Sequence, residues 1–272
     1  MAMSERRLLL ACCLLSLAGC AARPVTDGAP RSGSAAPPGL PADPVPRPEP
    51  RSRYGNGPIY EVYGKPYQVM NSSYGYRERG VASWYGRKFH GRMTSTQEPY
   101  DMNALTAAHK TLPLPTYVRV RNLQNNRSVI VRVNDRGPFV DNRIIDLSYA
   151  AARRLDMIDD GTSLVEITAI SYDEPPSAQA PAEAMSSGDK SADPAQRVYV
   201  QVGAFGERGN AERRFRLLRD GGIDNAFVLE KATSADPLYR VRIGPIADVA
   251  HYDTLVSRLA SLGIAESHLV TE

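Results

Sequence analysis

Two stretches that cannot build a hydrophobic core divide this chain and limit the size of its folded domains. Residues 20–53 and 172–196 are rich in Pro, Ala and Ser and have almost no large apolar side chains. Segments of this composition bury too little apolar surface to offset the entropy lost on ordering. We therefore predict a disordered tether, a linker and two small domains, at residues 80–171 and 197–272 of the 272-residue chain.

The first residues have the layout of a secretory signal peptide. Arg6 and Arg7 precede an apolar run over residues 8–17, which is too short to span a bilayer as a helix. The motif LAGC that ends at Cys20 resembles a bacterial lipobox. This predicts removal of residues 1–19 and lipidation of Cys20, and the alternative is a plain signal peptide with a chance cysteine. The residue after the cysteine is not Asp, which by analogy favours the periplasmic face of the outer membrane.

Cysteine usage and charge exclude several classes of function. The three cysteines are Cys12, Cys13 and Cys20, so the mature chain would hold no thiol nucleophile and no cysteine metal site. We expect no metal and no other cofactor. The formal charge of +3 comes from 33 basic and 30 acidic residues and gives no case for nucleic acid.

The first domain shows strand signals and one clear helix. Around Val118 and around Val131, apolar and polar residues alternate along the sequence, as they do in half-buried strands. Residues 148–155 read as a helix with Ser148 as its cap, and the Tyr-rich residues 54–79 lead into the domain. The predicted strands cover residues 81–85, 117–123, 127–133, 143–147 and 164–170. The domain is therefore predicted to be mostly β.

Three polar residues in this domain could carry glycosidic bond cleavage. Cleavage needs a proton donor for the leaving oxygen and a group that assists the nucleophile. Glu98, His109 and Asp135 have suitable side chains and lie in turn-like contexts beside strands. The alternatives are a solvated loop carboxylate for Glu98, a structural histidine and a turn cap for Asp135. Likewise, Trp84 and Tyr85 could be core residues or a stacking platform for a sugar ring.

Blocks over nearly the whole first domain resemble, in order, the rare lipoprotein A family. They are GVASWYG from Gly80, FHGR from Phe89, YDM from Tyr100, LTAAH from Leu105, TLPLP from Thr111, YVRV from Tyr117, VRVNDRGPFV from Val131 and RIIDLS from Arg143. The resemblance implies a double-psi β-barrel with a glycan groove. It also implies a lytic transglycosylase, which cleaves the bond from N-acetylmuramic acid to N-acetylglucosamine without water and leaves a 1,6-anhydro end. Glycan that lacks stem peptides is the implied substrate.

The same resemblance implies roles for individual residues. The residues that match Glu98, His109 and Asp135 are implicated in activity in that family. We expect Asp135 to protonate the leaving oxygen and then to accept the hydroxyl proton, with Glu98 and His109 positioning the sugar or tuning that acid. The opposite assignment of the two carboxyl groups stays open. Trp84, Tyr85 and Arg136 are expected to bind substrate.

One departure from the family pattern concerns the loop before Glu98. The family usually has Asn-Gly there, whereas this chain has Thr96 and Gln97. Glycine takes positive φ freely, so its loss predicts a differently shaped loop. The alternative function is therefore a wall-binding or wall-loosening protein that does not cut glycan.

The last domain shows the element order β-α-β-β-α-β, which predicts one sheet with both helices on one face. The blocks YVQVGAF from Tyr199 and YRVRIGP from Tyr239 resemble the SPOR domain, which binds denuded septal glycan on the open face of its sheet. The matching positions are Gln201, Ala204, Leu238 and Arg240, and the alternative is a surface-solvating role. These resemblances imply peptidoglycan and, through the lipid anchor, a membrane as partners at the division septum. A structural division-site scaffold is a further alternative, and the sequence identifies no protein partner.

Overall fold

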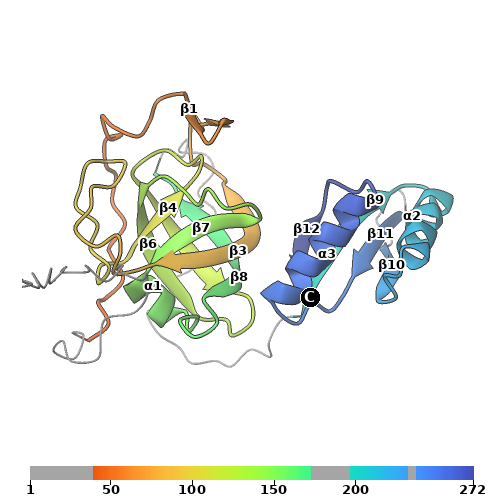
Figure 1. Ribbon diagram of the computed structural model, residues 1–272. Helices are drawn as coiled ribbons and strands as arrows, with labels where there is room; N and C mark the ends of the chain where they lie inside the picture. The colour runs from red at the N-terminus through yellow and green to blue at the C-terminus, as the bar shows by residue number, and fades with distance from the viewer. Residues whose placement is uncertain (1–38, 173–196, 232–236) are drawn as a thin grey trace, which may run out of the picture.

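The computed structural model describes residues 39–172, 197–231 and 237–272, and these form a barrel and a smaller sheet-and-helix domain (Figure 1). The predictions about the signal peptide, Cys20 and most of the linker lie outside the described residues. Within the described residues, no helix is long and apolar enough to cross a membrane.

A closed six-stranded barrel forms the first domain. Its strands are β3 (Arg77–Tyr85), β4 (Thr106–His109), β5 (Thr116–Asn122), β6 (Ser128–Asp135), β7 (Arg143–Ser148) and β8 (Thr162–Ile170). The order around the barrel is β3-β7-β4-β6-β5-β8, with β3/β7 and β4/β6 parallel and the other pairs antiparallel. Such crossovers make the barrel double-psi-like, and the prediction of a mostly β domain is confirmed.

Alternating valines fill the barrel interior. On β6, Val129, Val131 and Val133 are at most 1% exposed, while the residues between them reach the outer face. Helix α1 (Tyr149–Arg154) covers one end, and its cap residue Ser148 accepts a hydrogen bond from the nitrogen of Ala151 at 3.2 Å. The inner faces of the strands therefore hold the core, and polar side chains of β6 project outward.

A segment before the barrel, residues 39–56, lies along the barrel surface, and we call it the strap. Asp43 pairs with Arg154 at 2.9 Å, and the nitrogen of Ser52 donates to the carbonyl of Leu114 at 2.8 Å. Residues 39–53 were predicted to belong to a disordered tether, but here they are held by ion pairs and backbone hydrogen bonds. A hairpin of β1 (Ile59–Val62) and β2 (Lys65–Gln68) follows the strap.

The C-terminal domain has the predicted element order. Its elements are β9 (Val198–Phe205), α2 (Arg208–Asp220), β10 (Ala226–Lys231), β11 (Leu238–Ile243), α3 (Val249–Ser261) and β12 (His268–Thr271). The strands pair antiparallel in the order β10-β11-β9-β12. Leu218 of α2 and Leu259 of α3 share one buried cluster with Val200 of β9. Both helices therefore cover the same face of the sheet, as predicted, and among the described elements of this domain neither helix covers the other face.

Candidate active site

A tight turn over residues 94–98 presents Glu98 against the end of β6. The nitrogen of Thr94 donates to the carbonyl of Glu98 at 2.8 Å, and the nitrogen of Thr96 donates to the carbonyl of Asn134 at 3.3 Å. Gln97 takes the left-handed conformation with φ of 66°. The backbone thus bends at this position in the region that glycine favours, although a glutamine occupies it.

Asp135 has one carboxylate oxygen fixed and one oxygen left over. Its Oδ1 accepts hydrogen bonds from the nitrogen of Ser95 at 2.8 Å, the Oγ of Ser95 at 2.7 Å and the nitrogen of Arg136 at 2.8 Å. No side chain or backbone group in the described part of the chain donates to its Oδ2. The residue is partly exposed. The carboxyl group is therefore held in one orientation with an oxygen that remains for a ligand.

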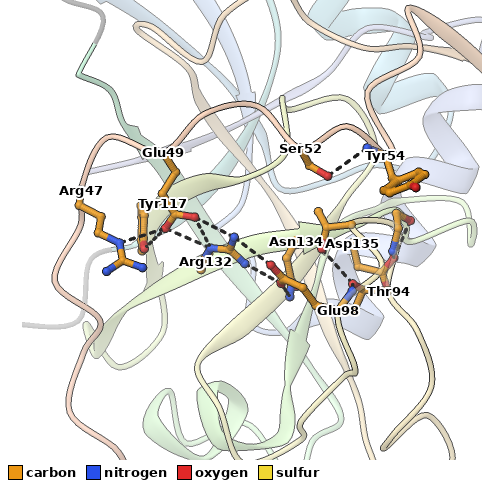
Figure 2. A network of polar contacts seen from close by, with 12 residues as sticks. Arg47, Glu49, Ser52, Tyr54, Thr94, Glu98, Tyr117, Arg132, Asn134 and Asp135 are labelled. Carbon is orange, nitrogen blue, oxygen red and sulfur yellow. Dashed lines mark hydrogen bonds and ion pairs between the residues drawn. The ribbon is translucent and has the colours of Figure 1, made fainter.

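Glu98 is a fixed anion. Arg132 of β6 reaches it twice, from Nη1 to Oε2 at 2.7 Å and from Nη2 to Oε1 at 3.1 Å, and Asn134 Nδ2 donates to Oε2 at 3.0 Å (Figure 2). Burial acts to raise the pKa of Glu98, but these hydrogen bonds and the charge of Arg132 outweigh it, so its pKa lies below the usual value. Glu98 is therefore ionised near neutral pH, which suits orientation or charge stabilisation better than proton donation.

His109 is buried and neutral. It is 3% exposed, and its Nδ1 accepts hydrogen bonds from the nitrogens of Thr111 at 3.2 Å and Leu112 at 3.0 Å. Its Nε2 must then carry the proton, which it donates to the hydroxyl of Tyr76 at 2.9 Å. Burial, together with the charges of Arg136 and nearby Lys110, lowers its pKa to about 3. These contacts fix the loop after β4 and leave the ring no direct access to a sugar.

Arg136 is not placed as a substrate contact, contrary to its prediction. Its guanidinium group donates to the carbonyls of Gly55 at 2.8 Å and Leu112 at 2.6 Å. Weaker bonds reach the carbonyls of His109 and Lys110 and the Oδ1 of Asn56. The physical reason is that five backbone and side-chain acceptors, drawn from the strap and the loop after β4, use its donors internally.

Trp84 and Tyr85 lie at the core rather than on an open platform. Tyr85 is 9% exposed and stacks on Tyr100 with ring centroids 4.2 Å apart. Trp84 is partly buried, packs against the barrel core and lies 5.7 Å from the ring of Tyr149. Of the two alternatives for this pair, the geometry favours core residues.

The structure adds Asp146 of β7, a carboxyl group that the sequence reasoning passed over. Ala108 of β4 pairs in register with Asp135 on one side and with Asp146 on the other, and Asp146 also pairs with Ser83. The Ser83 hydroxyl donates to Asp146. Burial raises the pKa of Asp146, against the opposing effect of the Ser83 hydrogen bond, and the charge of Asp135 raises it further. The available signal was a single acid inside the apolar strand run RIIDLS.

The predicted residues of the C-terminal domain lie together on the open face of its sheet. Arg240 pairs in register with Ala204, and Leu238 lies two residues before it on the same side of β11. Gln201 accepts a hydrogen bond from Arg242 Nε at 3.3 Å. Arg242, which the sequence reasoning did not single out, is 4% exposed and also pairs with Glu272.

Comparisons with known proteins agree with this architecture. Residues 77–167 match the family described as lytic transglycolase, and residues 194–270 match the SPOR domain. An endolytic peptidoglycan transglycosylase RlpA from Vibrio cholerae is 39% identical over 229 residues, which cover 84% of this chain and 82% of the relative. The protein of that name from Pseudomonas aeruginosa PAO1 is 38% identical over 270 residues, covering 81% and 78%. One from Neisseria meningitidis Z2491 is 60% identical over 111 residues, covering 41% and 46%. This chain belongs to the RlpA family, the rare lipoprotein A family.

Proposed function

We propose that this chain is an endolytic peptidoglycan transglycosylase that cuts between N-acetylmuramic acid and N-acetylglucosamine and leaves a 1,6-anhydro end. The observation that carries the proposal is Asp135, whose Oδ1 is held by three donors while its Oδ2 is left for a ligand. The relatives that share most of this chain bear the name of that activity. Orientation of a reacting group in this way lowers the entropic part of the barrier.

Asp135 would serve both proton transfers. It first protonates the bridging oxygen as the bond from C1 of the muramic acid breaks. The 6-hydroxyl of the same sugar then bonds to C1 and gives its proton to Asp135, so that Asp135 is protonated again at the end of the cycle. The anion of Glu98, fixed by Arg132, would stabilise the positive charge that develops at C1 or orient a sugar hydroxyl.

Asp146 would be the second carboxyl group of the site, beside Asp135. The two residues flank Ala108 across two strand spacings, so their backbones lie roughly 9–10 Å apart. Burial and the charge of Asp135 raise the pKa of Asp146, so the protonated form of Asp146 is favoured beside Asp135. The small side chain of Ala108 would leave room for the sugar between them.

Mass spectrometry of digested denuded glycan tests this proposal. The wild-type chain should release anhydro-muramic products, and Asp135→Asn should release none while it remains folded. Asp141→Asn is the matched control, because Asp141 is exposed and lies close in sequence on the loop before β7. If the wild type releases no product but still binds glycan, the chain is a wall-binding protein and the enzymatic proposal fails.

The C-terminal domain would bring the barrel to its substrate. We expect its open sheet face, around Gln201 and Arg240, to bind glycan without stem peptides at the septum, while lipid on Cys20 holds the chain to the outer membrane. Two weak sites on one chain raise each other's effective concentration. A fluorescent fusion that lacks residues 197–272 should lose its signal at the division site. Unchanged septal signal would contradict this role.

A further inference from the structure

The strap belongs to the candidate active site, and we infer that Glu49 is a residue that positions Glu98 through Arg132. This inference deepens the proposed function and rests on it for the part that concerns turnover. It concerns a segment whose composition predicted only a tether. Its evidence is a chain of contacts that starts in the strap and ends at Glu98 (Figure 2).

Glu49 is tightly held against the barrel. Its Oε2 accepts hydrogen bonds from Arg132 Nη2 at 2.8 Å and Arg132 Nε at 3.1 Å, and its Oε1 accepts one from the hydroxyl of Tyr117 at 2.5 Å. The side chain of Glu49 is 16% exposed, and that of Arg132 is 21% exposed. A pair with this geometry and partial burial is stronger than an ordinary surface ion pair.

Arg132 lies between two carboxylates. Its Nε and Nη2 face Glu49, while its Nη1 and Nη2 face Glu98. A guanidinium group is planar, so a partner that fixes one edge also fixes the direction of the other edge. Without Glu49, Arg132 would be free to turn about its long side chain, and Glu98 would lose its single orientation. Glu49 therefore acts on Glu98 without touching it.

The far end of the strap contacts the partners of Asp135. Gly55 has φ of 75°, and a Cβ there would lie 2.9 Å from the carbonyl oxygen of Ser95, the residue that holds Asp135 Oδ1. The carbonyl of Gly55 accepts from Arg136 Nε at 2.8 Å. The strap therefore also lies near the two residues that hold Asp135 Oδ1, whose donors are Ser95 and the backbone nitrogen of Arg136.

A positioning role and a merely structural role predict different pH behaviour. Burial acts to raise the pKa of Glu98, and the hydrogen bonds and charge of Arg132 hold it down. In Glu49→Gln, Arg132 loses its fixed orientation, its hydrogen bonds to Glu98 weaken, and the pKa of Glu98 rises toward its usual value. The acid limb of activity should then move to higher pH, whereas loosening of the strap alone would leave that limb in place.

The experiment uses the full mature chain and denuded glycan, with kcat and KM measured across pH for wild type, Glu49→Gln and Glu49→Asp. The control is Asp43→Asn, which weakens the strap at its pair with Arg154 but leaves Arg132 untouched. We expect Glu49→Gln to lower kcat by on the order of tenfold to a hundredfold with little change in KM. Its acid limb should shift to higher pH, Glu49→Asp should recover part of kcat, and Asp43→Asn should match wild type.

A titration of the Glu98 carboxyl carbon by NMR, assigned with Glu98→Gln, separates the two hypotheses. A higher pKa of Glu98 in Glu49→Gln supports the positioning role even where no form of the chain turns over glycan, which would defeat only the proposed function. An active wild type whose kcat, acid limb and Glu98 pKa are all unchanged by Glu49→Gln would overturn the inference. Equal losses in Glu49→Gln and Asp43→Asn without a pKa change would also overturn it.

Discussion

Replacement of Arg136 by lysine distinguishes an internal clamp from a substrate contact. The guanidinium group of Arg136 reaches acceptors on two segments, the strap through Gly55 and the loop after β4 through Leu112. Lysine keeps the positive charge but offers a single ammonium group, which cannot span both segments. We therefore expect Arg136→Lys to weaken the barrel fold and to spare the chemistry.

The expected loss of stability follows from the geometry of these bonds. Two of the five are short, at 2.8 Å and 2.6 Å, and the other three lie between 3.2 Å and 3.4 Å. A hydrogen bond to a charged group contributes about 1.5–3 kcal/mol, and a buried carbonyl left without a donor adds to the loss. If the short bonds dominate, Arg136→Lys lowers the free energy of unfolding by about 3 kcal/mol. For a domain of this size that corresponds to a fall in Tm on the order of 10 °C.

Trp84 gives a direct assay, because it is the sole tryptophan of the chain and lies in the barrel. Urea unfolding followed by its fluorescence reports the barrel without interference from the C-terminal domain. At a temperature where both proteins are folded, kcat and KM of Arg136→Lys should match those of wild type. If Arg136→Lys has the stability of wild type but a raised KM, the clamp is refuted and Arg136 is a substrate contact.

Four further outcomes are expected. Gln97→Gly should raise the free energy of unfolding by about 0.5–1 kcal/mol, measured in urea, because relief of the left-handed strain exceeds the entropy that glycine adds to the unfolded chain. The pKa of His109 is about 3 in the folded chain against 6.5 in the unfolded chain, so the stability that neutral His109 contributes is present above pH 6.5 and is lost as pH falls toward about 3. Over that pH range the urea midpoint of His109→Gln should therefore vary less than the midpoint of wild type. Glu166→Gln should cost about 1 kcal/mol in a urea titration near neutral pH, because its arginine partners are 22–58% exposed and stay solvated without it; a midpoint equal to that of wild type would contradict a stabilising pair. Asp146→Asn should lower kcat on denuded glycan while the chain stays folded, and an unchanged kcat would show that Asp146 is not part of the site.

The architecture of both domains was accessible from local pattern, and the exceptions have identifiable causes. The valine alternation on β6 and the turn residues of the C-terminal domain mark their strands, because burial on one face imposes a two-residue period. Strand β4, by contrast, was missed. Its residues Ala107 and Ala108 have low strand propensity, and pairing with β6 and β7 places them in the sheet.

The candidate site was predicted in its residues but not in their roles. Glu98 and Asp135 were singled out through the resemblance, yet nothing in a local pattern shows that Glu98 is ion-paired with Arg132 or that the donors of Arg136 are used internally. These roles depend on which acceptors the fold brings to each guanidinium group. Since charged residues on neighbouring segments compete for the same partners, a sequence motif identifies the groups present at a site but not which of them is left for the substrate.

The prediction of disorder from composition has a similar limit, and the strap shows it. Composition treats residues 39–53 as unable to form a core, which is correct, because the strap buries little apolar surface of its own. Its order comes instead from partners far away in sequence, since Glu49 and Arg132 are 83 residues apart and Arg132 and Glu98 are 34 apart. A segment can therefore be ordered by a structured neighbour that supplies specific charged and backbone contacts. A chain that begins at residue 54 lacks Glu49 but keeps every barrel strand. It should accordingly show a large fall in kcat and only a small fall in the unfolding free energy measured through Trp84.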